Sequence, residues 1–158
     1  MLNYNSVIKN EIKQESISVK EISPVIKINL RGKKREFLTN VGKNLNMILP
    51  TEANTSTTSD KLTAIWLSPD EWMIISNELA SKDTNKSDLY EMLFNSISKT
   101  NLGAVIDVTD QFVQLELKGE NVYEIFSAGS PFNFNEFKEK KGSTTQTVLN
   151  HIDVILHH

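Results

Sequence analysis

Acidic side chains at two places in the sequence could carry acid–base chemistry. Asp107 lies in the apolar run Ala104–Val108, and a carboxyl group buried there would have a raised pKa, so it could act as a general base or bind an amine. The alternatives are an Asp on the solvent face of an alternating strand and an Asp that caps the turn at Thr109. Asp70 and Glu71 are adjacent in a predicted turn, and their side chains are expected to diverge rather than act as a catalytic carboxylate pair.

The histidines and Ser130 do not form a recognisable catalytic or metal-binding pattern. His151 and His157 are expected on one strand face, six residues or roughly 20 Å apart, which is too far for one zinc site. Ser130 lacks the G-x-S-x-G context of a hydrolase nucleophile. The chain also has no G-x-G-x-x-G or G-x-x-x-x-G-K-[ST] motif. We therefore expect no metal site and no catalytic residues in this chain, and the sequence leaves cofactor-binding residues unidentified.

The composition is that of an ordinary globular protein. The chain has 158 residues, of which 23% are charged, and its formal net charge of -3 gives it no basic excess for binding nucleic acid. No stretch approaches the ~20 apolar residues of a membrane span, and the N-terminus lacks a signal-peptide pattern, so we expect no membrane association and a cytoplasmic protein. The absence of cysteine excludes disulfides and thiolate metal ligands.

The apolar positions of the N-terminal half predict strands, helices and one hairpin. Period-two alternation predicts strands over 17–19 and 26–30, and helical spacing predicts a helix within 33–49. The hydroxyl-rich residues 51–60 are expected to form an exposed loop. Further predicted elements are a hairpin of 61–67 and 71–76, joined by a turn at 68–70, and an amphipathic helix over 89–97 with Ser87 as its N-cap.

The C-terminal half predicts a second set of elements. Strands are expected over 104–108 and 112–117, with a break at 109–111. The remaining predicted elements are an amphipathic helix with Val122, Ile125 and Phe126 on one face, a stop at Gly129-Ser130-Pro131, a charged loop over 136–146 and a final strand over 148–156.

Taken in order, these elements predict an α+β fold. Residues 17–97 and 101–156 each follow the order strand, helix, strand, strand. Two such units would form an antiparallel sheet with helices packed on it. The predicted domain organisation is a flexible N-terminal tail over 1–14 and a single α+β domain over 15–158.

Four short motifs in the same order resemble those of the gamma subunit of heterotetrameric sarcosine oxidase. They are LPTEANT at 49–55, LSPDEW at 67–72, VIDVTDQFV at 105–113 and GSPFNF at 129–134. Three positions depart from the family pattern: Ser68 stands for Gly, Ser130 for Cys and Asn133 for Asp. The positions that carry the resemblance are Leu67, Pro69, Asp70, Glu71, Trp72, Asp107, Phe112, Gly129 and Pro131.

The resemblance implies a fold related to the folate-binding fold of aminomethyltransferases. It also implies a non-catalytic subunit of an oxidoreductase complex, which oxidatively demethylates sarcosine to glycine and passes the one-carbon unit to tetrahydrofolate. The partners would be the alpha, beta and delta subunits. FAD, FMN, NAD and tetrahydrofolate would belong to the complex, with no cofactor bound by this chain. The family has one further C-terminal strand, so this chain is either a truncated form or has a last strand without a neighbour.

Two alternatives to this interpretation stay open. The chain could belong to a related N-methyl amine dehydrogenase, or it could be a stand-alone folate-binding protein of the aminomethyltransferase type. A subunit without its partners should expose an apolar patch or self-associate. Trp66, Trp72 and Phe132 are the candidate residues for such a partner surface, because aromatic side chains are large and apolar.

Overall fold

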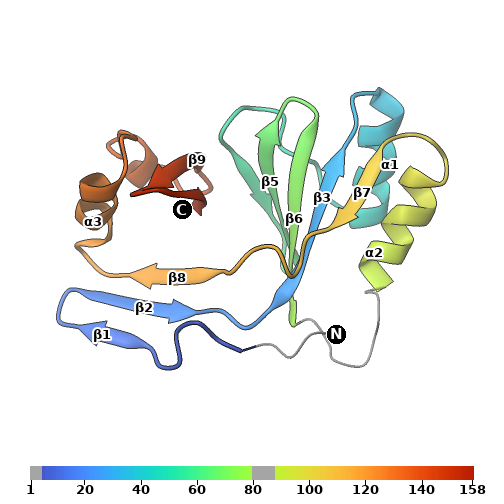
Figure 1. The fold of residues 1–158 in the computed structure, drawn as a ribbon. Coiled ribbons are helices and arrows are strands. Elements are labelled where there is room, and N and C mark those ends of the chain that lie inside the picture. The colour runs from blue at the N-terminus through green and yellow to red at the C-terminus, as the bar shows by residue number, and fades with distance from the viewer. Residues whose placement is uncertain (1–4, 80–87) are drawn as a thin grey trace. The chain divides into compact units, whose positions relative to one another are not determined.

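The computed structural model describes residues 5–79 and 88–158, and its chain divides into two compact units (Figure 1). Unit 1 is residues 24–112, and the described part of unit 2 is residues 5–23 and 113–158. Both contain antiparallel strands, and the described residues include three α-helices, so the fold class is α+β. That residues 15–158 behave as one domain stays a prediction, and each unit is described by itself.

Unit 1 is built on a five-stranded antiparallel sheet (Figure 1). Its central strands are long and apolar, and each central strand is hydrogen-bonded on both sides. The order across the sheet is β4 (Ser56–Thr58), β5 (Leu62–Ser68), β6 (Glu71–Leu79), β3 (Val25–Arg31) and β7 (Ala104–Asp107).

Helices cover one face of this sheet. Helix α1 spans Arg35–Leu45, and helix α2, Asp88–Leu93, continues into a π-helical turn, η1, over Phe94–Ser98. Alternation along the strands turns every second side chain toward the helices. The core between sheet and helices consists of fully buried side chains from both layers, among them Ile28, Leu30, Phe37, Val41, Ile74, Leu93 and Ile97.

Unit 2 combines a three-stranded sheet, a hairpin and one α-helix (Figure 1). In the sheet, β1 (Ile12–Gln14) pairs with β2 (Ile17–Glu21), which pairs with β8 (Leu115–Lys118). The hairpin joins β9 (Thr144–Leu149) to β10 (Ile152–His157). Helix α3 covers Val122–Gly129, and a 3-10 turn, η2, covers Phe137–Glu139.

An aromatic cluster forms the core of unit 2. Phe126, Phe134 and Phe137 are buried together with Val122, and half-buried side chains pack around them: Ile17, Leu117, Tyr123, Phe132, Leu149 and Leu156. The rings meet mostly edge to face, for example Phe132 and Phe134 with centroids 4.9 Å apart. Residues from the three-stranded sheet, from the β9–β10 hairpin and from α3 therefore share one core.

Most predicted elements are confirmed. The alternating runs form β2 and β3, the helical spacing over 33–49 forms α1, the predicted hairpin is β5 and β6, and the helix before Gly129 is α3. Ser87, the predicted N-cap of α2, lies outside the described residues. No helix among the described residues is long and apolar enough to cross a membrane.

Four predictions about the β-structure are wrong. The units predicted over 17–97 and 101–156 do not form one antiparallel sheet, because the described strands lie in three separate sheets of five, three and two strands. Residues 12–14 of the predicted tail form β1, because Ile12 pairs with Val19 of β2. Residues 56–58 of the predicted loop form β4, on the edge of the unit 1 sheet. The predicted final strand over 148–156 is instead divided between the two strands of a hairpin. Asn150, with a φ of 56°, supplies a left-handed turn between β9 and β10.

Candidate functional site

The motif residues of the sequence fall into separate parts of the fold. Leu67, Pro69, Asp70, Glu71 and Trp72 lie together at the turn between β5 and β6 of unit 1. Asp107 ends β7, and Phe112 is the last residue of the same unit. Gly129 and Pro131 lie in unit 2, at the end of α3 and just beyond it. The β5–β6 turn is therefore the one place where several motif residues are neighbours.

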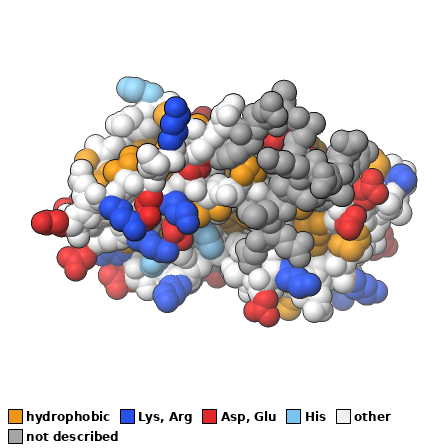
Figure 2. All heavy atoms as spheres, turned by 90° about the horizontal axis from the view of Figure 1, so that it is seen from below, with side chains coloured by type: hydrophobic (Ala, Val, Ile, Leu, Met, Phe, Trp, Pro, Cys, Tyr) orange, Lys and Arg blue, Asp and Glu red, His pale blue; other side chains and the backbone are white. Residues whose placement is uncertain are grey.

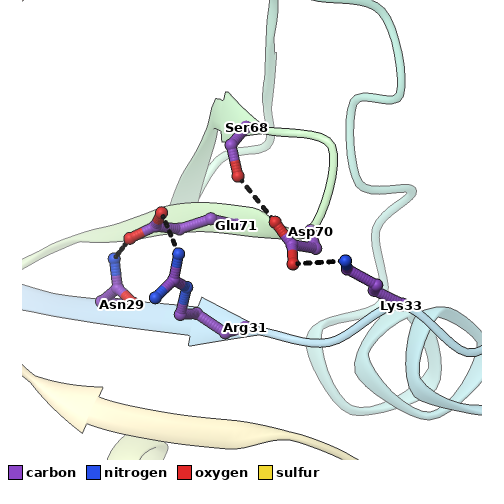
Figure 3. A network of polar contacts seen from close by, with 6 residues as sticks. All are labelled: Asn29, Arg31, Lys33, Ser68, Asp70 and Glu71. Carbon is purple, nitrogen blue, oxygen red and sulfur yellow. Dashed lines mark hydrogen bonds and ion pairs between the residues drawn. The ribbon is translucent and has the colours of Figure 1, made fainter.

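Glu71 is bonded to two side chains of the neighbouring strand β3 (Figure 3). Its Oε1 accepts a hydrogen bond from Asn29 Nδ2 at 2.7 Å, and its Oε2 lies 3.2 Å from Arg31 Nη2. The register places Glu71 directly opposite Arg31, so the ion pair joins cross-strand neighbours. Both carboxylate oxygens are occupied by contacts that hold β6 to β3.

Asp70 contacts Ser68 at the end of β5 and Lys33, which follows β3 (Figure 3). Its Oδ1 accepts a hydrogen bond from Ser68 Oγ at 2.9 Å, and its Oδ2 lies 3.4 Å from Lys33 Nζ. The Gly32 N–H also donates to the Asp70 carbonyl, at 2.9 Å. The hydrogen bond from Ser68 is the largest effect on the pKa of Asp70 and holds it below its ordinary value; burial opposes this shift, and the charge of Lys33 adds to it. Asp70 and Glu71 thus bond different partners.

Trp72 anchors the same turn from inside the core. It is 2% exposed, its Nε1 donates to the Pro50 carbonyl at 2.7 Å, and its ring lies 5.8 Å from that of Phe37. The prediction that Trp72 contributes to a partner surface is therefore wrong, because burial against α1 was not visible in a strand pattern with both faces apolar. Trp66, its cross-strand neighbour, and Phe132 are half-buried, and their role in a partner surface stays a prediction.

Asp107 caps a turn. The side chain is exposed, and its Oδ1 accepts a hydrogen bond from the Thr109 N–H at 2.9 Å. This geometry corresponds to the solvent-exposed, turn-capping alternative rather than to a buried general base. The Thr109 hydroxyl in turn accepts a hydrogen bond from the Lys27 N–H at 3.1 Å, which ties the turn to β3.

The histidines lie near the C-terminal hairpin. His151 is in the exposed turn, and His157 is the last residue of β10. The His158 ring packs on Tyr123 and Phe137 with centroid distances of 5.8 and 6.0 Å. Burial, and then the charge of His158, lower the pKa of His157. In the described ranges 5–79 and 88–158, no group of three His, Asp or Glu side chains is placed to hold a metal ion.

The structure adds a buried amine that the sequence interpretation missed. Lys27 lies within β3 and is 3% exposed, and its Nζ donates to the Val25 carbonyl at 3.3 Å. Burial lowers the pKa of Lys27, and the charge of Asp110 opposes that shift. Alternation in β3 predicts a side chain at position 27 on the face opposite Ile28, but nothing in the sequence indicates that this face is covered there.

Charges of both signs are interspersed on the face of the molecule that Figure 2 shows. In the view of Figure 2, Lys and Arg side chains lie next to Asp and Glu side chains. The same mixture occurs in the polar contacts around the β5–β6 turn, where Arg31 and Lys33 are each paired with a carboxylate.

Comparison with known proteins relates the fold to one chain of an amine oxidase. No protein-family model matches the sequence, and no match is found among curated proteins. A chain of the heterotetrameric sarcosine oxidase from Corynebacterium sp. U-96, solved in complex with pyrrole 2-carboxylate, is structurally similar with a TM-score of 0.78. The similarity covers 93% of this chain and 73% of that chain at 18% sequence identity. At this identity the similarity shows a shared fold.

Proposed function

We propose that this chain is the gamma subunit of a heterotetrameric sarcosine oxidase or of a closely related N-methyl amine dehydrogenase. The observation that carries the proposal is the similarity to a chain of such a heterotetramer, with a TM-score of 0.78 over 93% of this chain. Since the same region makes up 73% of the matched chain, that chain is only somewhat longer than this one. A short chain of this kind fits a small subunit better than a large flavin-binding one.

The four sequence motifs support the same assignment independently of the fold comparison. The LSPDEW motif forms the β5–β6 turn, and its Asp70, Glu71 and Trp72 are each engaged in a contact that holds the turn to the rest of unit 1. Polar atoms used in this way stabilise the fold rather than bind a substrate. This supports a non-catalytic role for the chain within an enzyme that oxidatively demethylates an N-methyl amine.

In this proposal the cofactors of the reaction belong to the other subunits. The alpha, beta and delta subunits would supply the FAD, FMN and NAD sites and the tetrahydrofolate site, and this chain would pack against them in the cytoplasm. The half-buried rings of Trp66 in unit 1 and Phe132 in unit 2 are the proposed contact residues. Aromatic side chains are enriched at such interfaces because they bury large apolar areas.

Co-expression tests the proposal. The tagged chain is expressed with the candidate alpha, beta and delta chains from its own genome, and the purified material is assayed for flavin absorbance and for sarcosine-dependent reduction of an electron acceptor. We expect one stoichiometric yellow complex whose yield falls when this chain is omitted. A chain that purifies alone and binds tetrahydrofolate in calorimetry would contradict the proposal and favour a stand-alone folate-binding protein.

Two surface variants sharpen that experiment. Trp66→Ala and Phe132→Ala should each reduce recovery of the partners if these rings contact them, and circular dichroism should show that the variant chains remain folded. Ile152→Ala is a matched control, since it removes an apolar side chain that is 70% exposed. Equal loss of partners in all three variants would argue against a specific contact through the two aromatic rings.

A further inference from the structure

The hairpin of unit 2 contains the longest edge strands among the described residues. β9 and β10 pair only with each other, and each has six residues. The edge strands of the other two sheets, β1, β4, β7 and β8, have three or four residues. β9 begins with the buried Thr144 and Thr145, whereas β10 begins with the exposed Ile152 and Asp153. β10 is therefore the long edge strand whose first residues are open to solvent.

β10 lacks the features that usually keep an edge strand from pairing with another chain. Its register with β9 continues without a bulge from Ile152 to His157, and it contains no proline. Four of its six residues are Ile, Val or Leu. On β7, by contrast, the Val105 N–H donates to Ser98 Oγ at 3.1 Å. A long, regular and apolar edge strand is a template for a further strand.

The backbone of β10 has donors that point away from β9. The Ser143–His158 pair at the end of the ladder is hydrogen-bonded, because the His158 N–H donates to the Ser143 carbonyl at 2.9 Å. Hydrogen-bonded and non-hydrogen-bonded pairs alternate along an antiparallel ladder. The Val154 N–H therefore points toward β9, whereas those of Asp153 and Ile155 point away from it. In the part of the chain that the structure describes, these two outward N–H groups have no acceptor.

The sequence of β10 is complementary to itself in an antiparallel arrangement. If Ile155 lies opposite Ile155 of a second copy, Val154 lies opposite the second copy's Leu156. In the same register Asp153 lies opposite His157 of the second copy. The carboxylate can accept a hydrogen bond from the imidazole, and two-fold symmetry repeats this pair at the other end. Apolar and polar cross-strand pairs of this kind stabilise antiparallel strands.

Other registers of the same two strands lose this match. With Val154 opposite its own copy, the Asp153 carboxylate faces the apolar Ile155. With Asp153 opposite its own copy, two carboxylates face each other, which is destabilising. The arrangement centred on Ile155 is therefore the one that pairs the polar and the apolar side chains correctly.

We propose that β10 is a self-association edge, at which a second copy of this chain pairs antiparallel through its own β10 in the register centred on Ile155. The two hairpins then form one sheet of four strands across a two-fold axis. Because the same edge is used by both copies, the contact closes a dimer and leaves no further β10 edge open. The proposal rests on the residues of β10 and does not depend on the proposed function.

Sedimentation of the purified full-length chain over a wide range of concentrations tests the pairing. We expect a monomer at low concentration and a dimer at high concentration. His157→Asp places two carboxylates opposite each other at both ends of the contact and should raise the dimer dissociation constant about tenfold. Asp153→Lys removes the acceptor and should also raise it. A chain that stays monomeric at every concentration would overturn the proposal.

Combining the two substitutions separates this contact from other ways of dimerising. The double variant Asp153→Lys with His157→Asp restores opposite charges across the axis and should dimerise more tightly than either single variant. Glu124→Lys makes the same change in charge as Asp153→Lys at an exposed position of α3, and should leave the dissociation constant unchanged. A double variant that is no tighter than the weaker single variant would contradict the proposed register.

Hydrogen exchange resolved by nuclear magnetic resonance identifies the edge that is used. The outward amides of Asp153 and Ile155 should be protected at high concentration and should exchange fast at low concentration. The amide of Val154 points toward β9 and should be protected at both, so it serves as an internal reference. A dimer in which the amides of Asp153 and Ile155 stay unprotected would use another surface and would overturn the proposal.

Discussion

Arg31 of β3 and Glu71 of β6 lie directly opposite each other, with Arg31 Nη2 3.2 Å from Glu71 Oε2. The pair closes the end of the central strand pair, and Asn29 adds a second bond to the same carboxylate. More than one bond to one side chain makes Glu71 the centre of this network, whereas Arg31 takes part through a single ion pair and is 56% exposed.

Glu71→Ala should therefore destabilise the protein more than Arg31→Ala. We expect a loss of about 1–2 kcal/mol for Glu71→Ala, since Asn29 loses its acceptor, and of less than about 1 kcal/mol for the exposed Arg31. Urea unfolding followed by circular dichroism measures both. Glu71→Gln is the control, because it keeps an acceptor for Asn29 and should lie between the two. An Arg31→Ala protein that loses more stability than Glu71→Ala would contradict this order.

Trp72→Phe should remove the hydrogen bond to Pro50 while keeping an aromatic ring against Phe37. A buried carbonyl left without its donor costs about 1–3 kcal/mol, so a loss in this range is expected in urea unfolding. Trp66→Phe is the matched control on the neighbouring strand, and its half-buried ring should cost less. Equal losses for both variants would mean that the bond to Pro50 contributes little.

Asp70 should make the stability depend on pH in the acidic range. Its pKa in the folded protein lies below the ordinary value of 3.8, so its contribution is fully present above that value and is lost as the pH falls through the folded pKa. In Asp70→Asn, the free energy of unfolding should decrease less as the pH is lowered into the acidic range. In Ser68→Ala, the pKa of Asp70 measured by nuclear magnetic resonance should rise, because the largest cause of the shift is removed. An unchanged pKa would contradict this assignment.

Gly119→Ala should be far more damaging than Gly129→Ala, although Gly129 belongs to a family-like motif. Gly119 has a φ of 133°, and a Cβ there would overlap the Ser16 carbonyl oxygen, which is backbone and cannot move aside easily. At Gly129 a Cβ would meet the end of the Leu149 side chain at 2.9 Å, which can shift. Thermal unfolding of both variants tests this difference, and a larger loss for Gly129→Ala would contradict it.

Much of the fold follows from local patterns in the sequence. Alternation along 26–30 and the Ser68-Pro69-Asp70 turn lead to β3 and to the β5–β6 hairpin, because period and turn chemistry are encoded within a few residues. The same reasoning did not predict the β9–β10 hairpin. Its turn at Asn150-His151 contains neither Gly nor Pro, so the two strands read as a charged loop followed by one strand.

Strand partners were harder to predict than strands. Residues 104–108 and 112–117 read as two consecutive strands, but β7 pairs with β3 and β8 pairs with β2. Alternation shows that a strand has an inner and an outer face, and it carries no information about the strand beside it. The choice of partner is made by contacts between distant residues, and the sequence of one chain does not reveal them.

The candidate site could likewise be predicted only in part from the sequence. The turn and its motif residues could be located from the sequence, and so could the divergence of the Asp70 and Glu71 side chains. Their partners Arg31 and Lys33 could not, since about forty residues separate them along the chain. The burial of Trp72 depends on α1, which only the folded arrangement brings to it.

Native mass spectrometry of the tagged chain, purified from its own cells without cross-linking, tests the proposed function most directly. The proposal predicts a complex of four different chains, one copy of this chain among them, with flavin retained and with oxidation of sarcosine or a related N-methyl amine. A chain recovered alone or only with copies of itself, while the cells retain full sarcosine-oxidising activity after its gene is deleted, would contradict the proposal.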